Sequence, residues 1–550
     1  MKFQPCDWSL TDEESKEQGR ITPTQEWSIQ RILDTIGDSD GAICGDEPGF
    51  GKTLIGTEVI LRAIELHGWT RILLVALPNT HKQWAERIEL QADGETPVPA
   101  YILNGTKAGK ENYARFMKHE PGIFIAGAAY LQEKDWESVP QVDDDGEPVW
   151  DIDKKTRLPK LKDGEPVVKM KSVRKNTFDR FGRKPLDAVV ADECQVWANR
   201  KAKGRQTILS IKAGFHAMFS GTWFNNKVEN QWSIARLTWP GLDPEGKPWI
   251  ETNFSRWSDE WLIREDVVSR GGRVLESPHG GSIKKVVGEK VPGAFAASLP
   301  CYIRRENADR PPAPLEIRVE PLPVQLAQMD ELQENLIAWV RDWEGQEAPL
   351  VVDLPITLRM RLRQVAIAEL SVEYTPEGGE TVAFKPDAQS AKLAPLRYLL
   401  EERWAGQPVG IFTDSKIGAH FVTARLQKAG KRARAWTGDL SAKEREALKT
   451  SFLEGEFDYL VGTVQSMGTG IDGLQKRASK VAWISEADGN PALNEQALAR
   501  YFRQGRTMEY GEFEHARLIC AGTVDEIALQ NLLDSAWSMR TALNAGRAAV

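Results

Sequence analysis

The chain has 550 residues, of which 41% are hydrophobic and 27% charged, and this length predicts two to four domains with separate cores. It contains no apolar run near the ~20 residues of a membrane helix, no signal-peptide pattern at its start and no closely spaced cysteine pair. These features argue against a membrane protein and favour a reducing cytoplasm (that of the host cell if the chain is viral), while the net charge of −8 still allows nucleic acid in a locally basic cleft.

A glycine-rich loop near the N-terminus is the first element with clear chemistry. "SDGAICGDE" is typical of a short strand, "DEPGFGKT" of a tight loop, and "KTLIGTEVILRAIEL" of a helix with apolar residues at helical spacing. In this context Gly49 and Gly51 let backbone N–H groups turn toward phosphates at the positive end of the new helix. Lys52 is predicted to pair with the β- and γ-phosphates of ATP, and Thr53 to bind Mg²⁺. The alternative for this motif alone is a chance match in a glycine-rich turn.

Three other residues can complete a nucleotide site. Gln25 lies about 20 residues before the loop, where its amide can read the adenine edge, although a glutamine before a helix is usually a surface residue. "LDAVVADECQVW" predicts a buried parallel strand that presents two carboxylates at its C-terminal end. Asp192 is expected to hold Mg²⁺ through its water shell, and Glu193 to orient and deprotonate the attacking water.

The segments on either side of this strand are less specific. Residues 143–153 carry six acids and no base, and residues 154–184 carry twelve Lys or Arg against three acids. We favour a solvated insertion for this stretch over an auxiliary DNA-contacting loop. "AMFSGTWFNN" predicts a strand that ends at a turn, and six tryptophans follow between residues 223 and 261. Buried helical packing is the favoured interpretation of these tryptophans, with base stacking as the alternative.

The C-terminal half alternates strand and helix patterns again, as in "QPVGIFTDSKIGAHFVTARLQKAG" and "FDYLVGTVQSMGTGIDGL". The segment "NPALNEQALARYFRQGRT" predicts a helix with Gln496, Arg500 and Arg503 at i, i+4 and i+7, on one face. Because this domain has no phosphate loop of its own, two arginines on such a face can donate hydrogen bonds to a phosphate that another domain binds. An ordinary salt-bridged surface helix is the alternative.

These motifs, in this order, resemble those of Swi/Snf-type ATPases of helicase superfamily two. "DEPGFGKT" is similar to that family's Asp-Glu-Met-Gly-Leu-Gly-Lys-Thr, "DECQ" to its Asp-Glu-x-His/Gln box and "SGTWFNN" to its Ser/Thr-Gly-Thr-Pro-x-x-Asn. "ILLVALPNTHKQWAERI" resembles the family's next motif. The most specific likeness is "CYIRRENADRPPAPLEIRVEPLPVQLAQMDEL", residues 301–332, which resembles the Arg-Arg segment between the two motor halves. The resemblance extends from about Ile21 to Leu543.

The resemblance implies an α/β fold with two RecA-like parallel-sheet domains in tandem and a helical insertion between them. The expected boundaries are 1–235 for the first domain (with a charged insertion at about 141–185), 236–385 for the helical protrusion and linker, 386–525 for the second domain and 526–550 for a brace helix. It adds Asp46 and Asp472 to the ATP-binding residues, which otherwise comprise Gln25, Gly49, Gly51, Lys52 and Thr53. It assigns coupling roles to Gln195, Ser220, Thr222 and Gln496, and catalytic roles to Lys52, Asp192, Glu193, Arg500 and Arg503.

The implied function is an ATPase stimulated by DNA that moves along duplex DNA, remodels it or displaces bound proteins, with ATP and Mg²⁺ as cofactors. Such a motor should contact phosphates rather than base edges. We expect those contacts at Pro78–Trp84, Gly127–Tyr130, Asp414–Lys416 and Thr463–Ser466. Two alternatives stay open: a strand-separating DNA or RNA helicase, and a P-loop switch or scaffold without motor activity.

Overall fold

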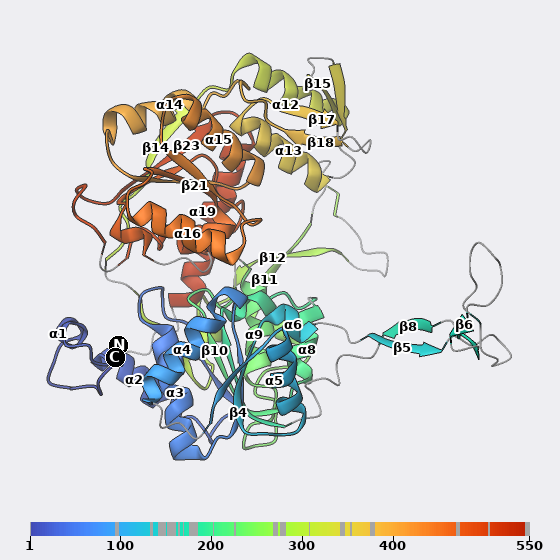
Figure 1. The fold of residues 1–550 in the computed structure, drawn as a ribbon, viewed down its shortest axis with the longest axis vertical. Helices are drawn as coiled ribbons and strands as arrows, with labels where there is room; N and C mark the ends of the chain where they lie inside the picture. The colour runs from blue at the N-terminus through green and yellow to red at the C-terminus, as the bar shows by residue number, and fades with distance from the viewer. Residues whose placement is uncertain are drawn as a thin grey trace. The chain divides into compact units, whose positions relative to one another are not determined.

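The computed structural model describes residues 2–93, 98–132, 136–140, 150, 161–162, 165–168, 170–174, 185–201, 203–224, 227–267, 273–274, 282–306, 309–341, 347–351, 355–374, 380–468, 473–503 and 506–544. The chain folds into two compact units (Figure 1). The N-terminal unit consists of residues 1–43, 53–219 and 233–250, and the C-terminal unit of residues 44–52, 220–232 and 251–550. Within the described part of the chain, no helix combines the length and apolar character needed to cross a membrane.

The first sheet has seven strands in the order β13-β1-β10-β9-β2-β4-β3. Its strands are β1 (Gly41–Cys44), β2 (Arg71–Val75), β3 (Ala100–Leu103), β4 (Gly122–Ala126), β9 (Leu186–Asp192), β10 (Ala213–Phe219) and β13 (Tyr302–Ile303). β9 pairs in parallel with β2 and β10, and β4 pairs in parallel with β2 and β3. Every residue of β1, β2 and β4 is buried, as the short apolar runs of the sequence predict for strands covered on both faces.

Helices surround this sheet in the alternating order expected of parallel strands. They are α1 (Asp12–Glu17), α2 (Pro23–Leu33), α3 (Lys52–His67), α4 (His81–Ala92), α5 (Lys107–Met117), α6 (Ala128–Gln132), α8 (Lys203–Ser210) and α9 (Gln231–Thr238), with 3₁₀ turns at Pro78–Thr80, Cys194–Trp197 and Val228–Asn230. The predicted charged insertion at 141–185 lies largely outside the described residues. Its described parts are β6 (Leu161–Lys162), β7 (Glu165–Pro166) and β8 (Met170–Arg174), which pairs with β5 (Trp136–Pro140).

The second sheet has six strands in the order β14-β23-β22-β19-β21-β20. They are β14 (Leu315–Val319), β19 (Val409–Thr413), β20 (Ala433–Trp436), β21 (Tyr459–Thr463), β22 (Lys480–Trp483) and β23 (Glu514–Cys520). All five neighbouring pairs of strands in this sheet are parallel. The associated helices are α12 (Pro323–Asn335), α13 (Pro355–Ile367), α14 (Leu393–Tyr398), α15 (Lys416–Lys428), α16 (Ala442–Leu453), α17 (Val464–Gly468), α18 (Pro491–Leu498) and α19 (Val524–Asn544), with a π-helical turn at Leu399–Arg403 and a 3₁₀ turn at Leu474–Lys476.

The region expected to be a helical protrusion combines helices with antiparallel hairpins. The helices α10 (Phe254–Trp261) and α11 (Ala294–Ala297) accompany the pairs β11 (Leu262–Asp266) with β12 (Lys284–Glu289), β15 (Ile337–Arg341) with β16 (Glu347–Val351), and β17 (Ser371–Tyr374) with β18 (Glu380–Ala383). The predicted fold class is confirmed, because the chain contains two parallel α/β sheets. Trp223, Trp239 and Trp257 are each at most 1% exposed, as predicted, but of these three only Trp257 lies in a helix.

A buried histidine in the first sheet gives a prediction for stability against pH. His216 lies in β10, is 2% exposed, and burial lowers the pKa of its imidazole to about 4. Below pH ~6.5 the imidazole of His216 is protonated in the unfolded chain, whereas in the folded chain it stays neutral down to about pH 4. The free energy of unfolding therefore falls as the pH is lowered, by about 3 kcal/mol between pH 7 and pH 4. Urea unfolding of His216→Phe should lack this part of the pH dependence, whereas the exposed His420→Gln should retain it. An equal slope in wild type and His216→Phe would contradict the assignment.

Candidate nucleotide site

The glycine-rich loop has the backbone conformation that its sequence predicts. Gly49 and Gly51 adopt positive φ angles of 102° and 77°, which residues with a Cβ rarely accept. Helix α3 begins at Lys52, so the loop ends at a helix N-terminus with Thr53 in the first turn. This combination of turned backbone and helix start favours an anion such as a phosphate.

The ammonium group of Lys52 closes the loop on itself. Its Nζ donates to the backbone carbonyl oxygen of Asp46 at 2.7 Å and to that of Glu47 at 3.2 Å. Both acceptors are neutral carbonyls, so the positive charge of Lys52 is not matched by these contacts. A phosphate oxygen can replace them with a charge-assisted bond, which is stronger.

Asp46 holds the loop to the Arg-Arg segment, and this was not anticipated from the sequence. Its carboxylate is fully buried and pairs with the guanidinium of Arg305, whose backbone N–H also donates to Asp46 Oδ1 at 2.9 Å. The neighbouring Arg304 donates to the carbonyl oxygens of Gly45 at 2.5 Å and Gly221 at 2.7 Å. These contacts give Asp46 an anchoring role, and its part in ATP binding stays a prediction. The "IRRE" run was recognised as part of the linker, but the sequence does not indicate which acid its arginines bind.

The two predicted carboxylates stand at the end of β9. In the sheet β9 is adjacent to β10, which is adjacent to β1, the strand that leads into the loop. The last residues of β9 and β10, Asp192 and Phe219, are paired, and parallel strands share the edge at which they end. Glu193 follows with a φ of 54°, an uncommon left-handed conformation for a glutamate, and its Oε2 accepts from Gln195 Nε2 at 2.6 Å. The predicted coupling residue Gln195 therefore contacts the predicted base directly.

The residues predicted to bind Mg²⁺ fit that ion by their chemistry. Thr53 and Asp192 offer a hydroxyl and a carboxylate, both hard oxygen ligands. Among the described residues, no group of three or more His, Cys, Asp or Glu side chains could hold a metal ion. A single protein carboxylate suits Mg²⁺, which usually keeps several waters and binds substrate phosphates in place of an all-protein cage.

Two other predicted groups have structural contacts. Gln25 forms a capping box at the start of α2, where its Oε1 accepts from the backbone N–H of Thr22 at 3.1 Å. This contact uses one of the two acceptor sites of Gln25 Oε1, so recognition of adenine by Gln25 stays a prediction. Ser220 is fully buried, and its Oγ accepts from the backbone N–H of Thr222 at 3.1 Å, which shapes the turn after β10. The predicted Asp472 lies outside the described residues.

The prediction that Gln496, Arg500 and Arg503 share one helical face is wrong. Helix α18 ends at Leu498, so Arg500 and Arg503 lie in the irregular segment that follows. The chain leaves the helix because Tyr501 is fully buried beside Phe412, with the two ring centroids 5.9 Å apart. Arg500 instead donates through Nη2 and Nε to the carbonyl oxygen of Gly468, at 2.8 and 3.1 Å.

Several segments predicted to contact nucleic acid use their side chains internally. Trp84 is 1% exposed, and its indole N–H donates to Asp192 Oδ2 at 3.1 Å. The hydroxyls of Thr463 and Ser466 lie 2.6 Å apart, and Ser466 Oγ also donates to the carbonyl oxygen of Trp436. Asp414 accepts from Ser485 Oγ at 2.7 Å.

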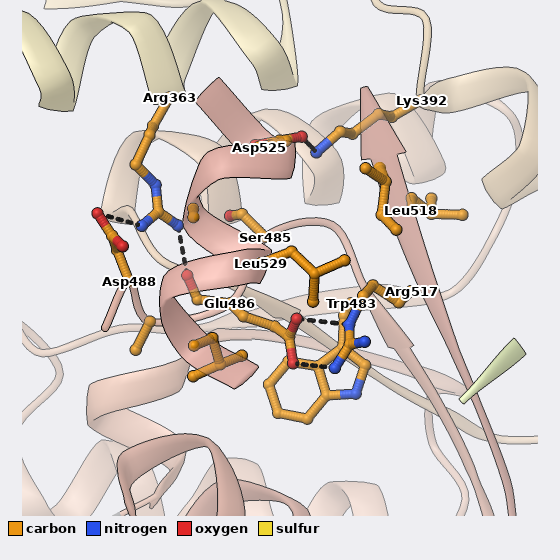
Figure 2. A pocket seen from close by; sticks show the side chains of 14 residues that line it. Arg363, Lys392, Trp483, Ser485, Glu486, Asp488, Arg517, Leu518, Asp525 and Leu529 are labelled. Atoms are coloured by element: carbon orange, nitrogen blue, oxygen red, sulfur yellow. Dashed lines mark hydrogen bonds and ion pairs between the residues drawn. The ribbon is translucent and has the colours of Figure 1, made fainter. Parts of the chain in front are cut away.

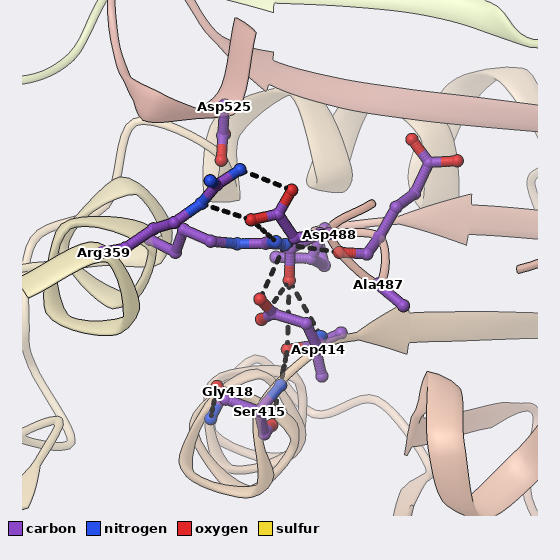
Figure 3. A network of polar contacts seen from close by, with 12 residues as sticks. Arg359, Asp414, Ser415, Gly418, Ala487, Asp488 and Asp525 are labelled. Atoms are coloured by element: carbon purple, nitrogen blue, oxygen red, sulfur yellow. Dashed lines mark hydrogen bonds and ion pairs between the residues drawn. The ribbon is translucent and has the colours of Figure 1, made fainter. Parts of the chain in front are cut away.

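Asp414 belongs to a buried charge cluster that sequence reasoning missed (Figure 3). Arg363 of α13, whose side chain is 7% exposed, lies 2.7 Å from Asp414 Oδ2 and 3.4 Å from Asp488 Oδ2, and donates to the backbone carbonyl of Glu486. Arg359, one turn earlier, contacts Asp488 at 2.5 Å. The carboxylates follow β19 and β22, while the arginines come from a helix that precedes both strands, so no local pattern connects them.

The same region encloses a small cavity of about 30 Å³ between the end of β22, α13 and α19 (Figure 2). On one side Arg517 pairs with Glu486 at 2.6 Å, and burial raises the pKa of this glutamate while Arg517 opposes the rise. On the other side the buried Lys392 donates to the carbonyl of Ile484 at 2.6 Å and pairs with Asp525 of α19 at 2.5 Å. The contacts of Lys392 join the start of α19 to the end of β22, and the Arg517–Glu486 pair joins β23 to the segment after β22.

Removing Arg363 should therefore destabilise the C-terminal unit. Arg363→Met removes the buried cation shared by the half-buried Asp414 and Asp488, and because Asp488 keeps Arg359, we expect a loss of about 1–3 kcal/mol. Chemical unfolding should show this loss, whereas Arg397→Met, which removes an exposed i,i+4 pair with Glu401, should change stability little. Equal stability of the two variants would contradict a structural role for the cluster.

Two parallel sheets with a glycine-rich loop between β1 and α3 place the chain among P-loop α/β proteins. Residues 8–260 match the family model of the SNF2-related domain. This match supports the resemblance to Swi/Snf-type ATPases of helicase superfamily two over residues 8–260, a little under half of the chain, and the second sheet lies outside the matched residues.

The chain also has more limited likenesses to individual proteins. The ATP-dependent RNA helicase RhlB of Actinobacillus succinogenes is 31% identical over 133 residues, covering 22% of this chain and 32% of that protein. RhlB of Haemophilus influenzae is 28% identical over 182 residues, covering 31% and 41%. The chain thus spans well under half the length of these curated relatives. A Sulfolobus solfataricus SWI2/SNF2 ATPase core in complex with dsDNA is 18% identical, with a TM-score of 0.35 and coverage of 96% of this chain and 97% of that one.

Proposed function

We propose that the protein is a DNA-stimulated ATPase that uses ATP hydrolysis to move along duplex DNA, remodel it or displace proteins bound to it. The observation that carries the proposal is the arrangement of the first sheet. Its strand β1 leads into a loop with two positive-φ glycines, and β9, two strands away, ends in Asp192 and Glu193. This arrangement of loop and carboxylates serves phosphoryl transfer in P-loop NTPases.

Each residue of the site has a proposed task. Lys52 exchanges its loop carbonyls for the β- and γ-phosphates, while Thr53 and Asp192 hold Mg²⁺. Bound Mg²⁺ neutralises charge on the β- and γ-phosphate oxygens. Glu193 accepts a proton from the attacking water, with Gln195 fixing the orientation of its carboxylate. Arg500 and Arg503 supply positive charge to the transferring phosphoryl group.

DNA is proposed as the track because the family that the chain resembles acts on duplex DNA. The proposed contacts are to the phosphate backbone, through the turn Pro78–Thr80 and through Lys416 at the start of α15, whose ammonium group pairs with Asp439 in the protein alone. A motor that reads no sequence needs only such contacts, and its binding should weaken with salt.

A strand-separating RNA or DNA helicase is the second candidate. The observation that favours it is the match to RhlB proteins, which are named ATP-dependent RNA helicases. The third candidate, a P-loop switch without motor activity, is disfavoured by the intact Glu193 and its contact with Gln195.

One experiment separates the three candidates. ATP turnover is measured with duplex DNA, single-stranded DNA, RNA or no nucleic acid, together with displacement of a triplex third strand and of a duplex strand. Stimulation by duplex DNA with triplex but not duplex displacement supports the proposed translocase. Strand separation of RNA or DNA supports the helicase. An ATP turnover rate that is the same with and without each nucleic acid supports the switch.

A further inference from the structure

Trp84 connects helix α4 to the carboxylate that we propose to bind Mg²⁺. Its side chain enters from the first turns of α4 and is 1% exposed. The indole Nε1 donates to Asp192 Oδ2 at 3.1 Å. A buried indole usually finds one partner for its single N–H, and here that partner is the last residue of β9.

The ring of Trp84 packs closely against Gly56 of α3. A Cβ on Gly56, in the middle of α3, would lie 2.8 Å from Trp84 Cη2 and 3.5 Å from the ring of Phe219. The helix that follows the phosphate loop therefore needs a glycine at this turn, although glycine weakens a helix interior. The ring is held between α3 and the strand ends, so its N–H is directed by packing as well as by the hydrogen bond.

We propose that Trp84 is a positioning residue for the metal site, which orients the Asp192 carboxylate toward the Mg²⁺ of bound ATP; this inference rests on the proposed function. A group that hydrogen-bonds a metal ligand fixes its orientation, and loss of such a group typically weakens metal binding 10–100-fold. The sequence alone placed Trp84 among nucleic-acid contacts, because its motif was interpreted as a whole.

The same contact offers a route from nucleic acid to the metal. The 3₁₀ turn Pro78–Thr80 leads directly into α4, and Trp84 lies one turn further along. His81, between them, contacts the carbonyl oxygen of Ala76 through Nε2 at 3.1 Å, which ties the start of α4 to the end of β2. A phosphate backbone bound at the turn would then act on Asp192 through one helical turn and one hydrogen bond.

The test compares Trp84→Phe with a matched control. Phenylalanine keeps an aromatic ring but removes the N–H. Trp239→Phe makes the same change at another fully buried tryptophan, whose N–H donates to Ser39 Oγ at 3.3 Å in the same unit. Mn²⁺ binding to the full chain with a non-hydrolysable ATP analogue is followed by electron paramagnetic resonance, and metal-free nucleotide binding and thermal unfolding are measured alongside.

We expect about a 10-fold rise in the Mn²⁺ dissociation constant for Trp84→Phe and less than 2-fold for Trp239→Phe, with similar thermal shifts in both. Equal Mn²⁺ affinity in the two variants would overturn the role of Trp84 while leaving the ATPase proposal intact. Absence of metal-dependent nucleotide binding in the wild type would instead overturn the proposed function. If Trp84→Phe does not fold, Gly56→Ala displaces the ring with its N–H retained, and unchanged Mn²⁺ affinity there would equally contradict the inference.

Discussion

Replacing Glu193 with glutamine is expected to reduce ATP turnover by about 10²–10⁴-fold and to leave nucleotide binding nearly unchanged. Glutamine has the same size and keeps an oxygen that can accept from Gln195 Nε2, now 2.6 Å from Glu193 Oε2. What it loses is the ability to take a proton from the attacking water. The φ of 54° at this position is already adopted by an unbranched side chain, so the change adds no backbone strain.

The measurement is single-turnover hydrolysis with and without nucleic acid, together with equilibrium binding of a fluorescent ATP analogue. Glu65→Gln, on the exposed side of α3, is the matched control for removing one carboxylate from the same unit. Turnover of Glu193→Gln close to that of the control would show that another group accepts the proton. Loss of nucleotide binding in Glu193→Gln would assign the residue to ground-state binding.

The parts of the fold that were predictable are those with a local cause. Apolar runs such as "GAIC" and "LDAVVAD" became buried strands, because a run without alternation suits a strand covered on both faces. The loop was predictable for a similar reason, since Gly49 and Gly51 adopt φ angles that other residues avoid.

The contacts that were missed join residues far apart in the sequence. Asp46 and Arg305 are separated by 259 positions, and Arg363 and Asp488 by 125. The sequence does not show whether an aspartate is buried or exposed. The pairing of Asp46 with Arg305, which anchors the loop, therefore has no periodic or compositional signal. The end of α18 was missed because helical spacing continued past it, while burial of Tyr501 against Phe412 decided the path of the chain.

Removing either Arg500 or Arg503 is expected to reduce nucleic-acid-stimulated hydrolysis by about 10³–10⁵-fold, with little change in ATP affinity. An arginine that meets the charge of the transferring phosphoryl group acts in the transition state, so its loss lowers the rate more than binding. Arg500 already uses its guanidinium as a fork, donating through Nη2 and Nε to the carbonyl oxygen of Gly468. Arg500→Lys should recover little, because lysine lacks the planar fork that reaches two acceptors.

Arg540→Ala provides the matched control, because Arg540 lies in the same unit and contacts Glu495 of α18 from the exposed side. Turnover is measured at saturating ATP with and without duplex DNA, and thermal unfolding separates a catalytic loss from a structural one. If Arg500→Ala lowers the unfolding temperature but retains stimulated turnover, its bond to Gly468 is structural and the proposed charge must come from Arg503 alone. If both variants retain stimulated turnover, the irregular segment after α18 does not serve the reaction, and the ATPase must stabilise the phosphoryl charge without these arginines.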